Sequence, residues 1–259
     1  MAELTWKPAH ELAEMIRKRQ LKPSELMAAT ITRLESVNPK LNAFVALRAE
    51  QAMAEARALD EKIPKREELG PLAGLPFGVK DLEDAAGLPT TFGSKPFKSH
   101  MPEGDSVEVA RLRAAGAIVL GKTNAPEFGY TGFTKNLIFG VTRNPWNLER
   151  TPGGSSGGSS AAISAGIVPL CTGSDGGGSI RIPACYTGCY GLKPSKGRIP
   201  ETAMLKMQQW NDTAVVGPLT RTVRDAAMFM DAAVGYHPSD PDSLPHPGIS
   251  YQAILDRLP

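Results

Sequence analysis

The stretch TPGGSSGGSSAAISAGIVPLCTGSDGGGSIRIPA, residues 151–184, decides the fold. It contains two turns rich in glycine and serine, at 153–158 and 173–179, on either side of an expected helix at 161–165 and an apolar strand at 167–171. Twelve of the chain's 26 glycines lie between residues 153 and 197. Glycine lacks a Cβ atom, so the backbone can turn sharply there and approach other groups closely. We therefore expect two tight polar turns held in an apolar frame.

Short apolar runs alternate with helical segments outside this stretch as well. Strands are expected at 75–79 and 117–120, and helices at 105–115 and 222–233, where apolar residues recur at helical spacing. This alternation predicts an α/β domain with a largely buried sheet. Gly217 and Pro218 are expected to interrupt the chain before the last helix, and the proline-rich tail from Tyr236 is expected to be a loop.

The first 65 residues are expected to be mostly helical. Apolar residues share one face in 8–20 and again in 24–37, and a short strand at 41–47 precedes an alanine- and glutamate-rich helix at 48–62. We expect this region, 1–65, to pack on a core formed by residues 66–259.

The composition is that of a globular protein. The 259 residues are 41% hydrophobic and 22% charged, which allows a sizeable core. The 29 basic and 27 acidic residues are interspersed, and the lack of a basic tract argues against nucleic acid as a partner. No run is long and apolar enough for a membrane span, and no secretory signal begins the sequence, so we expect a cytoplasmic protein. Its three cysteines have no neighbouring histidine, which predicts packed thiols and no metal site: Cys171, Cys185 and Cys189.

One short motif, GAIVLGKT at 116–123, matches the phosphate-loop pattern G-x4-G-K-[ST]. A phosphate loop needs a glycine-rich turn followed by a helix whose backbone N–H groups bind phosphate. Here the four central residues are themselves the expected strand, and Asn124-Ala-Pro126 follows where the helix should begin. We reject nucleotide binding.

A second motif, GGSSG at 153–157, matches the nucleophile elbow G-x-S-x-G of α/β-hydrolases. An acid followed by a histidine is available downstream, from Asp225 or Asp231 and His237 or His246. The elbow must directly follow a strand, however, and the residues before it are rich in turn formers. An esterase of this type is kept as an alternative.

Ser179 is the better candidate nucleophile on chemical grounds. It follows Gly176, Gly177 and Gly178, whose backbone N–H groups can converge on a small anion beside its hydroxyl. A serine needs a base, and a lysine serves only when burial keeps its amine neutral. Lys80 lies at the end of an apolar strand, but a lysine at a strand end is usually a solvated surface charge, so this position alone does not make it the base.

The long glycine- and serine-rich stretch resembles the signature of the amidase signature family, which are serine amidohydrolases with a Ser–cis-Ser–Lys triad. The resemblance extends to PFGVKD at 76–81, GKTNAPEF at 121–128, GLKPSKGRIP at 191–200 and GPLTRTVRD at 217–225. It covers about residues 70–235 in the order of the family. It implies the family's fold, a mixed β-sheet flanked by helices on both faces, and amide hydrolysis without a metal or organic cofactor.

The same resemblance assigns roles to individual residues. It implies Ser179 as the nucleophile that becomes acylated, Ser155 as the bridging serine after a cis peptide bond, and Lys80 as the base. It places the oxyanion hole at the N–H groups of Gly176 to Ser179, and the glycine at 176 stands where the family commonly has a side chain. Supporting roles are expected for Ser156 as a hydrogen-bond partner within the triad, for Asp175 and Arg181 as a buried ion pair, and for Phe128, Gly129 and Tyr130 as part of the substrate pocket.

Three functions remain open at this point. The first is an amidase acting on a small amide, hydrazide, carbamate or ester, and the second is the glutamine-hydrolysing subunit of a transfer-RNA amidotransferase. The run ETAMLKMQQWNDT at 201–213 differs from the one usual in such subunits, which favours the first function. The third is a non-catalytic fragment that binds a partner. Family members are nearly twice this length, so we expect 259 residues to be an N-terminal segment, or else a homodimer that covers its open sheet edges.

Overall fold

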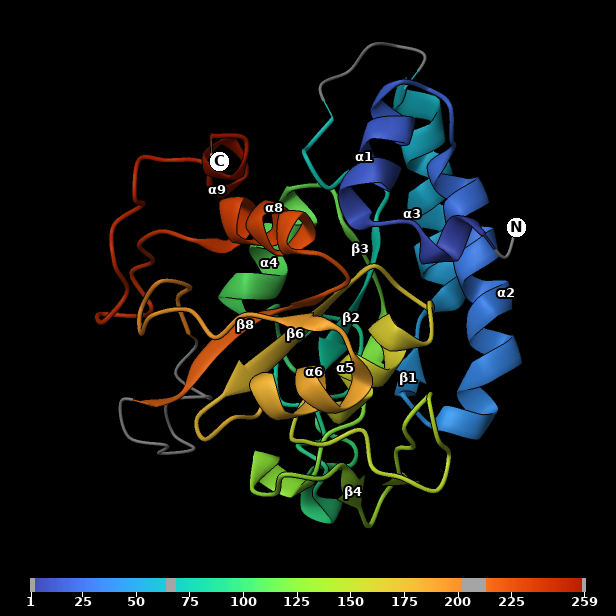
Figure 1. Ribbon diagram of the computed structural model, residues 1–259, viewed down its shortest axis with the longest axis vertical. Coiled ribbons are helices and arrows are strands. Elements are labelled where there is room, and N and C mark those ends of the chain that lie inside the picture. The colour runs from blue at the N-terminus through green and yellow to red at the C-terminus, as the bar shows by residue number, and fades with distance from the viewer. Residues whose placement is uncertain (1–2, 64–68, 202–212, 258–259) are drawn as a thin grey trace.

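The structure, a computed structural model, describes residues 3–63, 69–201 and 213–257. A six-stranded mixed sheet lies at its centre (Figure 1). Its strand order is β1-β3-β2-β6-β8-β7. The strands are β1 (Phe44–Leu47), β2 (Pro76–Lys80), β3 (Ile118–Thr123), β6 (Leu170–Asp175), β7 (Tyr190–Gly191) and β8 (Val215–Thr220). A separate two-stranded sheet pairs β4 (Lys135–Asn136) with β5 (Gly140–Val141).

Strand β2 lies inside the sheet between two parallel neighbours, β3 and β6. The chain connects these three strands through helices, as parallel pairing requires. Strand β1 is antiparallel to β3, and β8 is antiparallel to both β6 and β7. The mixed sheet flanked by helices confirms the predicted fold class.

The helices cover both faces of the sheet (Figure 1). They are α1 (Ala9–Arg17), α2 (Pro23–Leu41), α3 (Ala49–Lys62), α4 (Val107–Ala114), α5 (Gly157–Ser164), α6 (Arg181–Thr187), α8 (Val223–Ala233) and α9 (Tyr251–Leu255). The described residues also form the short 3-10 helices η1 (Leu4–Trp6), η3 (Lys95–Phe97) and η4 (Glu127–Gly129).

Two hydrophobic clusters follow from the alternation of side chains along the strands. Val119 and Leu170 pack on one face with residues of α1, α4 and α8. Leu120 and Cys171 pack on the other face with residues of α3, α5 and α6. The N-terminal helices thus belong to the same apolar core as the strands. The proposed boundary after residue 65 lies outside the described residues.

Helix α5 begins at Gly157, four residues before the predicted start. Its first turn, GGSS, has low intrinsic helix propensity, but all four residues are buried. A Cβ atom at Gly158 would lie 2.3 Å from the backbone nitrogen of Asn124, so glycine lets this helix pack against the end of β3. Close packing outweighs propensity here.

Several elements differ from the sequence predictions. Gly217 and Pro218 lie inside strand β8, so the predicted interruption there is wrong. The Pro218 carbonyl accepts from the Leu192 N–H on the β7 side of the strand. The nitrogen of Pro218 faces the same side, so the N–H that proline lacks is not needed for the pairing with β6. The sequence does not predict helix α6. Helix α9 lies in a tail predicted to be a loop, and Ser250 caps it by accepting a hydrogen bond from the Ala253 N–H.

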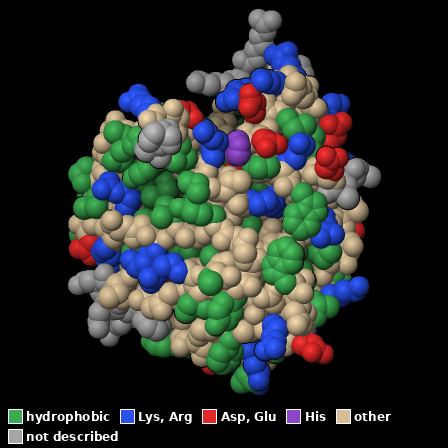
Figure 2. All heavy atoms as spheres, viewed as in Figure 1, with side chains coloured by type: hydrophobic (Ala, Val, Ile, Leu, Met, Phe, Trp, Pro, Cys, Tyr) green, Lys and Arg blue, Asp and Glu red, His purple; other side chains and the backbone are tan. Residues whose placement is uncertain are grey.

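The face of the molecule drawn in Figure 2 carries a mixture of side-chain types. On the face drawn in Figure 2, basic and acidic groups are interspersed among hydrophobic and uncharged ones. Within residues 3–63, 69–201 and 213–257, no helix has the length and apolar character that crossing a membrane requires.

Candidate active site

The candidate site lies where two parallel strands end. Lys80 is the last residue of β2, and Asp175 is the last residue of β6. Because β2 and β6 pair in parallel, these two ends meet at the same edge of the sheet. The turn 176–179 continues directly from β6 and leads into α6.

Lys80 is fully buried, with its ammonium nitrogen held among hydroxyl groups. Its Nζ atom lies 2.8 Å from Ser155 Oγ and 2.8 Å from Ser174 Oγ, and its backbone N–H donates to Thr172 Oγ1 at 2.9 Å. Burial lowers the pKa of Lys80 to about 7, although nearby carboxylates favour the charged form. A substantial fraction of this amine is therefore neutral near pH 7 and can accept a proton.

Ser155 lies in the loop that leads into α5. The peptide bond between Gly154 and Ser155 is cis. The neighbouring Ser156 makes its side-chain hydrogen bonds with Ser174, donating to its carbonyl and accepting from its N–H, both at 3.3 Å. Its own backbone N–H donates to the Ser179 carbonyl at 3.1 Å, which ties this loop to the turn after β6.

Ser155 and Ser179 line one small cavity of about 30 Å³. Phe128 and Gly129 line the same cavity, whereas Tyr130, which is 61% exposed, is not among the lining residues in the described part of the chain. The lining comprises Leu82, Phe128, Gly129, Ser155, Ser174, Asp175, Gly176, Ser179, Glu201, Ala214, Val215 and Val216.

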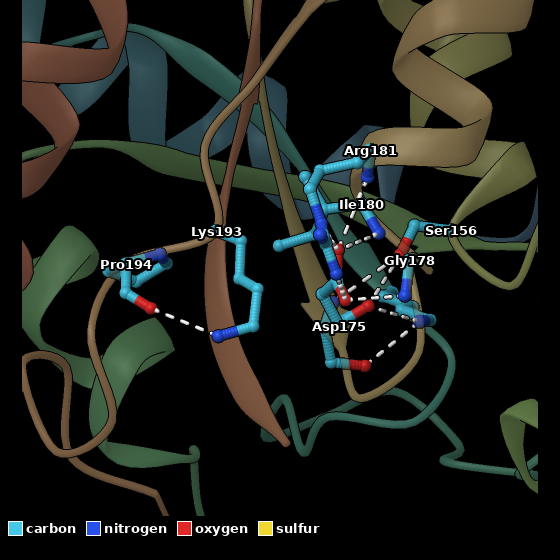
Figure 3. A network of polar contacts seen from close by, with 9 residues as sticks. Ser156, Asp175, Gly178, Ile180, Arg181, Lys193 and Pro194 are labelled. Carbon is cyan, nitrogen blue, oxygen red and sulfur yellow. Dashed lines mark hydrogen bonds and ion pairs between the residues drawn. The ribbon is translucent and has the colours of Figure 1, made fainter. Parts of the chain in front are cut away.

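Asp175 braces the turn that carries Ser179, as Figure 3 shows. Its carboxylate accepts from the backbone N–H groups of Gly178 at 2.7 Å and Ile180 at 3.1 Å, and it pairs with Arg181 at 2.9 Å. Burial alone would raise the pKa of Asp175, but Arg181 and these N–H donors outweigh it and bring the pKa down to about 2. The ion pair is only half buried, because the Arg181 side chain is 56% exposed.

This bracing affects the candidate oxyanion hole. The Gly178 N–H points to the Asp175 carboxylate, so it is committed to holding the turn. Gly176, Gly177 and Ser179 remain as candidate donors to an oxyanion.

Ser174 is a site residue that the sequence analysis does not predict. Its hydroxyl contacts Lys80, and its backbone contacts Ser156. In the sequence, Ser174 and Asp175 are two polar residues at the end of an apolar strand, and this pattern could have indicated a site residue.

The structure shows what the residues of the phosphate-loop pattern and of the nucleophile-elbow pattern form. Residues 118–123 form strand β3, and the buried Lys122 contacts Thr90 Oγ1 at 2.9 Å and the Glu83 carbonyl, which confirms the rejection of a phosphate loop. Ser155 has Lys80 as its side-chain neighbour, while His237 Nδ1 contacts Ser239 Oγ and His246 Nδ1 accepts from the Gly248 N–H. The nucleophile-elbow hypothesis is therefore wrong.

The cysteines differ in their surroundings. Cys171 is buried in the core and Cys189 is partly buried, but Cys185 is exposed, so the prediction of three packed thiols is wrong for Cys185. Within the described ranges, no three His, Cys, Asp or Glu side chains gather as a metal-binding group.

Comparison with known proteins identifies the family. A family model described as Amidase matches residues 25–256. The chain belongs to the amidase signature family. Members of this family with solved structures share the fold: a bacterial aryl acylamidase superimposes with a TM-score of 0.89 and 39% identity over 96% of this chain and 52% of its own.

Two curated relatives of this family represent different activities. An acylamidase from Rhodococcus erythropolis is 46% identical over 249 residues, 96% of this chain and 52% of its own. A glutamyl-tRNA(Gln) amidotransferase subunit from Acidothermus cellulolyticus is 43% identical over 247 residues, 95% of this chain and 48% of its own. The chain spans about half the length of the curated relatives it matches.

Proposed function

We propose that the protein hydrolyses an amide through an acyl-enzyme on Ser179, with Lys80 as the base and Ser155 as the proton carrier between them. The observation that supports this most is the position of Lys80: a fully buried amine, with its pKa lowered by burial to about 7, lies 2.8 Å from Ser155 Oγ at a cavity that Ser179 also lines. A neutral lysine beside a serine can accept its proton.

The first half of the cycle forms the acyl-enzyme. Lys80 takes a proton from Ser155 as Ser155 takes one from Ser179, and Ser179 Oγ bonds to the substrate carbonyl carbon. The negative charge on the carbonyl oxygen is stabilised by N–H groups of Gly176, Gly177 and Ser179. The carbon–nitrogen bond then breaks, the leaving amine takes a proton from Ser155, and Ser155 regains one from Lys80.

The second half repeats the relay with water. Water gives a proton through Ser155 to Lys80 and bonds to the acyl carbon. When the bond to Ser179 breaks, its oxygen recovers that proton, and a carboxylic acid leaves. Every step is a proton transfer or acyl transfer among groups of this chain, substrate and water.

The proposed substrate class is an acylated amine, including aryl amides. The relatives named acylamidase and aryl acylamidase, at 46% and 39% identity, support this class. Phe128 lines the cavity and offers an apolar surface for an acyl or aryl group.

A fluorophosphonate probe tests the nucleophile. We expect an adduct on Ser179, located by mass spectrometry, that is lost in Lys80→Ala and kept in His237→Ala and His246→Ala. An adduct on Ser155 that depends on either histidine would contradict the proposal. An unreactive Ser179 in folded protein would instead support a non-catalytic role.

A glutamine-hydrolysing role within an amidotransferase is a second candidate, because the relative from Acidothermus cellulolyticus is 43% identical. The segment that argued against it, 201–213, lies largely outside the described residues. Hydrolysis of an aryl acylamide by the protein alone favours the amidase. Glutamine hydrolysis that requires transfer RNA and a partner protein favours the amidotransferase.

A further inference from the structure

Two aromatic residues near the candidate site have a left-handed backbone. The φ angle is +54° at Phe92 and +48° at Phe128, and within the described residues only Arg19 and Asn42 join them as non-glycine residues with positive φ. A bulky side chain rarely adopts this conformation, which costs free energy and persists only where the surrounding structure fixes it. The contacts around these two residues should therefore show what holds them.

The two phenylalanines are bound to each other. The Phe128 N–H donates to the Phe92 carbonyl at 2.8 Å, and their rings stack with centroids 6.3 Å apart and planes inclined by 19°. The ring of Phe97 stands edge-on to both, with its centroid 5.4 Å from that of Phe92 and 5.9 Å from that of Phe128. Phe92 is only 2% exposed, whereas Phe128 is partly buried. The buried Phe92 thus supports the more accessible Phe128.

The turn that carries Phe92 is attached to the end of β2. Asp81, the residue directly after Lys80, accepts from the Phe92 N–H at 3.1 Å through its backbone carbonyl. Its carboxylate accepts from the Thr91 N–H at 2.9 Å and from the Thr91 hydroxyl. The same hydroxyl oxygen accepts from the Gly93 N–H at 3.1 Å, and Asp81 and Thr91 are each 1% exposed. These bonds fix the position of Phe92 relative to the strand that carries Lys80.

Phe128 borders the candidate cavity. It lines this cavity together with Ser155 and Ser179, whereas Phe92 is not among the lining residues in the described ranges. The residue after Phe128 lies close to Ser155, since a Cβ atom at Gly129 would lie 3.3 Å from Ser155 Oγ. Phe128 therefore lies on the side of the cavity that Ser155 occupies, with Phe92 behind it.

We propose that Phe128 forms the wall of the pocket for the leaving amine and that Phe92 is the positioning residue that holds this wall in place. The inference rests on the proposed function, in which Ser155 gives a proton to the leaving nitrogen. A group attached to that nitrogen then lies beside Ser155, where Phe128 offers it an apolar contact. An aromatic amine gains this contact and ammonia does not. The substrates that this wall selects are amides of aromatic amines.

The test compares hydrolysis of acetanilide, which releases aniline, with hydrolysis of acetamide, which releases ammonia. Phe92→Leu keeps the backbone carbonyl but removes the stacked ring, so it should raise KM for acetanilide about tenfold while kcat changes by less than about twofold. KM for acetamide and the rate of fluorophosphonate labelling of Ser179 should stay the same. Phe229→Leu, at a fully buried phenylalanine of α8 in the core, is the matched control and should change neither KM.

A double variant shows whether Phe92 acts through Phe128. Phe128→Leu should raise KM for acetanilide at least as much as Phe92→Leu does, and Phe92→Leu/Phe128→Leu should raise it no further than Phe128→Leu alone. A double effect equal to the product of the single effects overturns the positioning role. An equal rise in KM for both substrates also overturns it, because a general loosening of the site would produce that result.

Thr91 provides a second test, whether or not Phe92→Leu folds. Thr91→Val removes the hydroxyl that bonds to Asp81 and should raise KM for acetanilide alone, whereas Thr91→Ser keeps a hydroxyl and should retain the wild-type value. Equal KM values for acetanilide in these two variants overturn the proposal. A wild type that cleaves acetamide but not acetanilide overturns this inference alone. A wild type that cleaves neither amide and whose Ser179 is not labelled overturns the proposed function as well.

Discussion

The Lys80 Nζ atom lies 2.8 Å from Ser155 Oγ, although 75 residues separate the two in the chain. Their contact depends on the order of the strands: β2 carries Lys80 to the edge of the sheet, and the loop before α5 brings Ser155 to the same edge. The contact also depends on burial, since an exposed lysine keeps its ordinary pKa and stays charged. Position and burial together turn an ordinary lysine into a candidate base.

Burial of Lys80 should reduce the stability of the fold. Its pKa falls from 10.5 to about 7 on folding, so between these values the unfolded chain binds more protons and stability rises with pH. Lys80→Met removes this dependence, and below pH 7 it also removes the full cost of burying the amine. We expect the variant to be more stable at pH 7 by on the order of 2 kcal/mol after its lost hydrogen bonds are counted.

Urea unfolding of both proteins at several pH values measures this difference. The advantage of Lys80→Met should shrink steadily from pH 7 to pH 10. A variant that is less stable than the wild type at pH 7, or an advantage that does not change with pH, would contradict the assignment of a buried, largely neutral amine.

Lys122→Met should have the opposite effect on stability. Lys122 is also fully buried, but its ammonium lies 3.8 Å from Asp81 and contacts Thr90 and the Glu83 carbonyl. Removing it leaves the buried Asp81 carboxylate without its cation, which should cost about 3 kcal/mol in the free energy of unfolding. The same substitution at the exposed Lys18 should change it by less than about 0.5 kcal/mol, and equal losses at both positions would exclude this explanation.

The sequence was informative where function depends on local pattern. Ser179 follows three glycines, so local pattern alone singles it out, whereas Lys80 at a strand end becomes a candidate base only through the resemblance to the family. The resemblance to the family then added Ser155 and the cis peptide bond, which no hydropathy pattern indicates. The structure brings Lys80 and Ser155 into contact and gives Ser155 and Ser179 a common cavity, while their catalytic roles stay predictions.

Features that depend on strand register and packing could not be predicted in this way. Ser174 meets Lys80 because β6 pairs with β2. The start of α5 was misplaced for a related reason: its glycines lower helix propensity but are needed for close packing.

Asp175→Asn should loosen the turn that carries Ser179. The carboxylate accepts from Gly178 and Ile180 and pairs with Arg181, and an amide cannot replace all of these bonds. We expect a loss of about 3 kcal/mol in the free energy of unfolding and slower labelling of Ser179. Arg181→Gln is the control: its side chain is 56% exposed, so its loss should stay below about 1 kcal/mol. Equal losses would mean that the ion pair, and not the backbone donors, holds the turn.

Alanine substitutions at two glycines distinguish the effect of a steric clash from the effect of an unfavourable backbone conformation. Gly129 and Gly87 have φ values of +73° and +83°, which an alanine adopts at a cost of about 1 kcal/mol. A Cβ atom at Gly129 would lie 2.8 Å from Leu82 Cδ1 and 3.3 Å from Ser155 Oγ, whereas at Gly87 nothing lies within 4 Å. Gly129→Ala should therefore displace Ser155 and slow labelling of Ser179 by at least about tenfold, a loss of roughly 1.4 kcal/mol in transition-state stabilisation. Gly87→Ala should lose a similar amount of stability and label at the normal rate, so equal rates in the two variants would show that Ser155 does not depend on the position of Gly129.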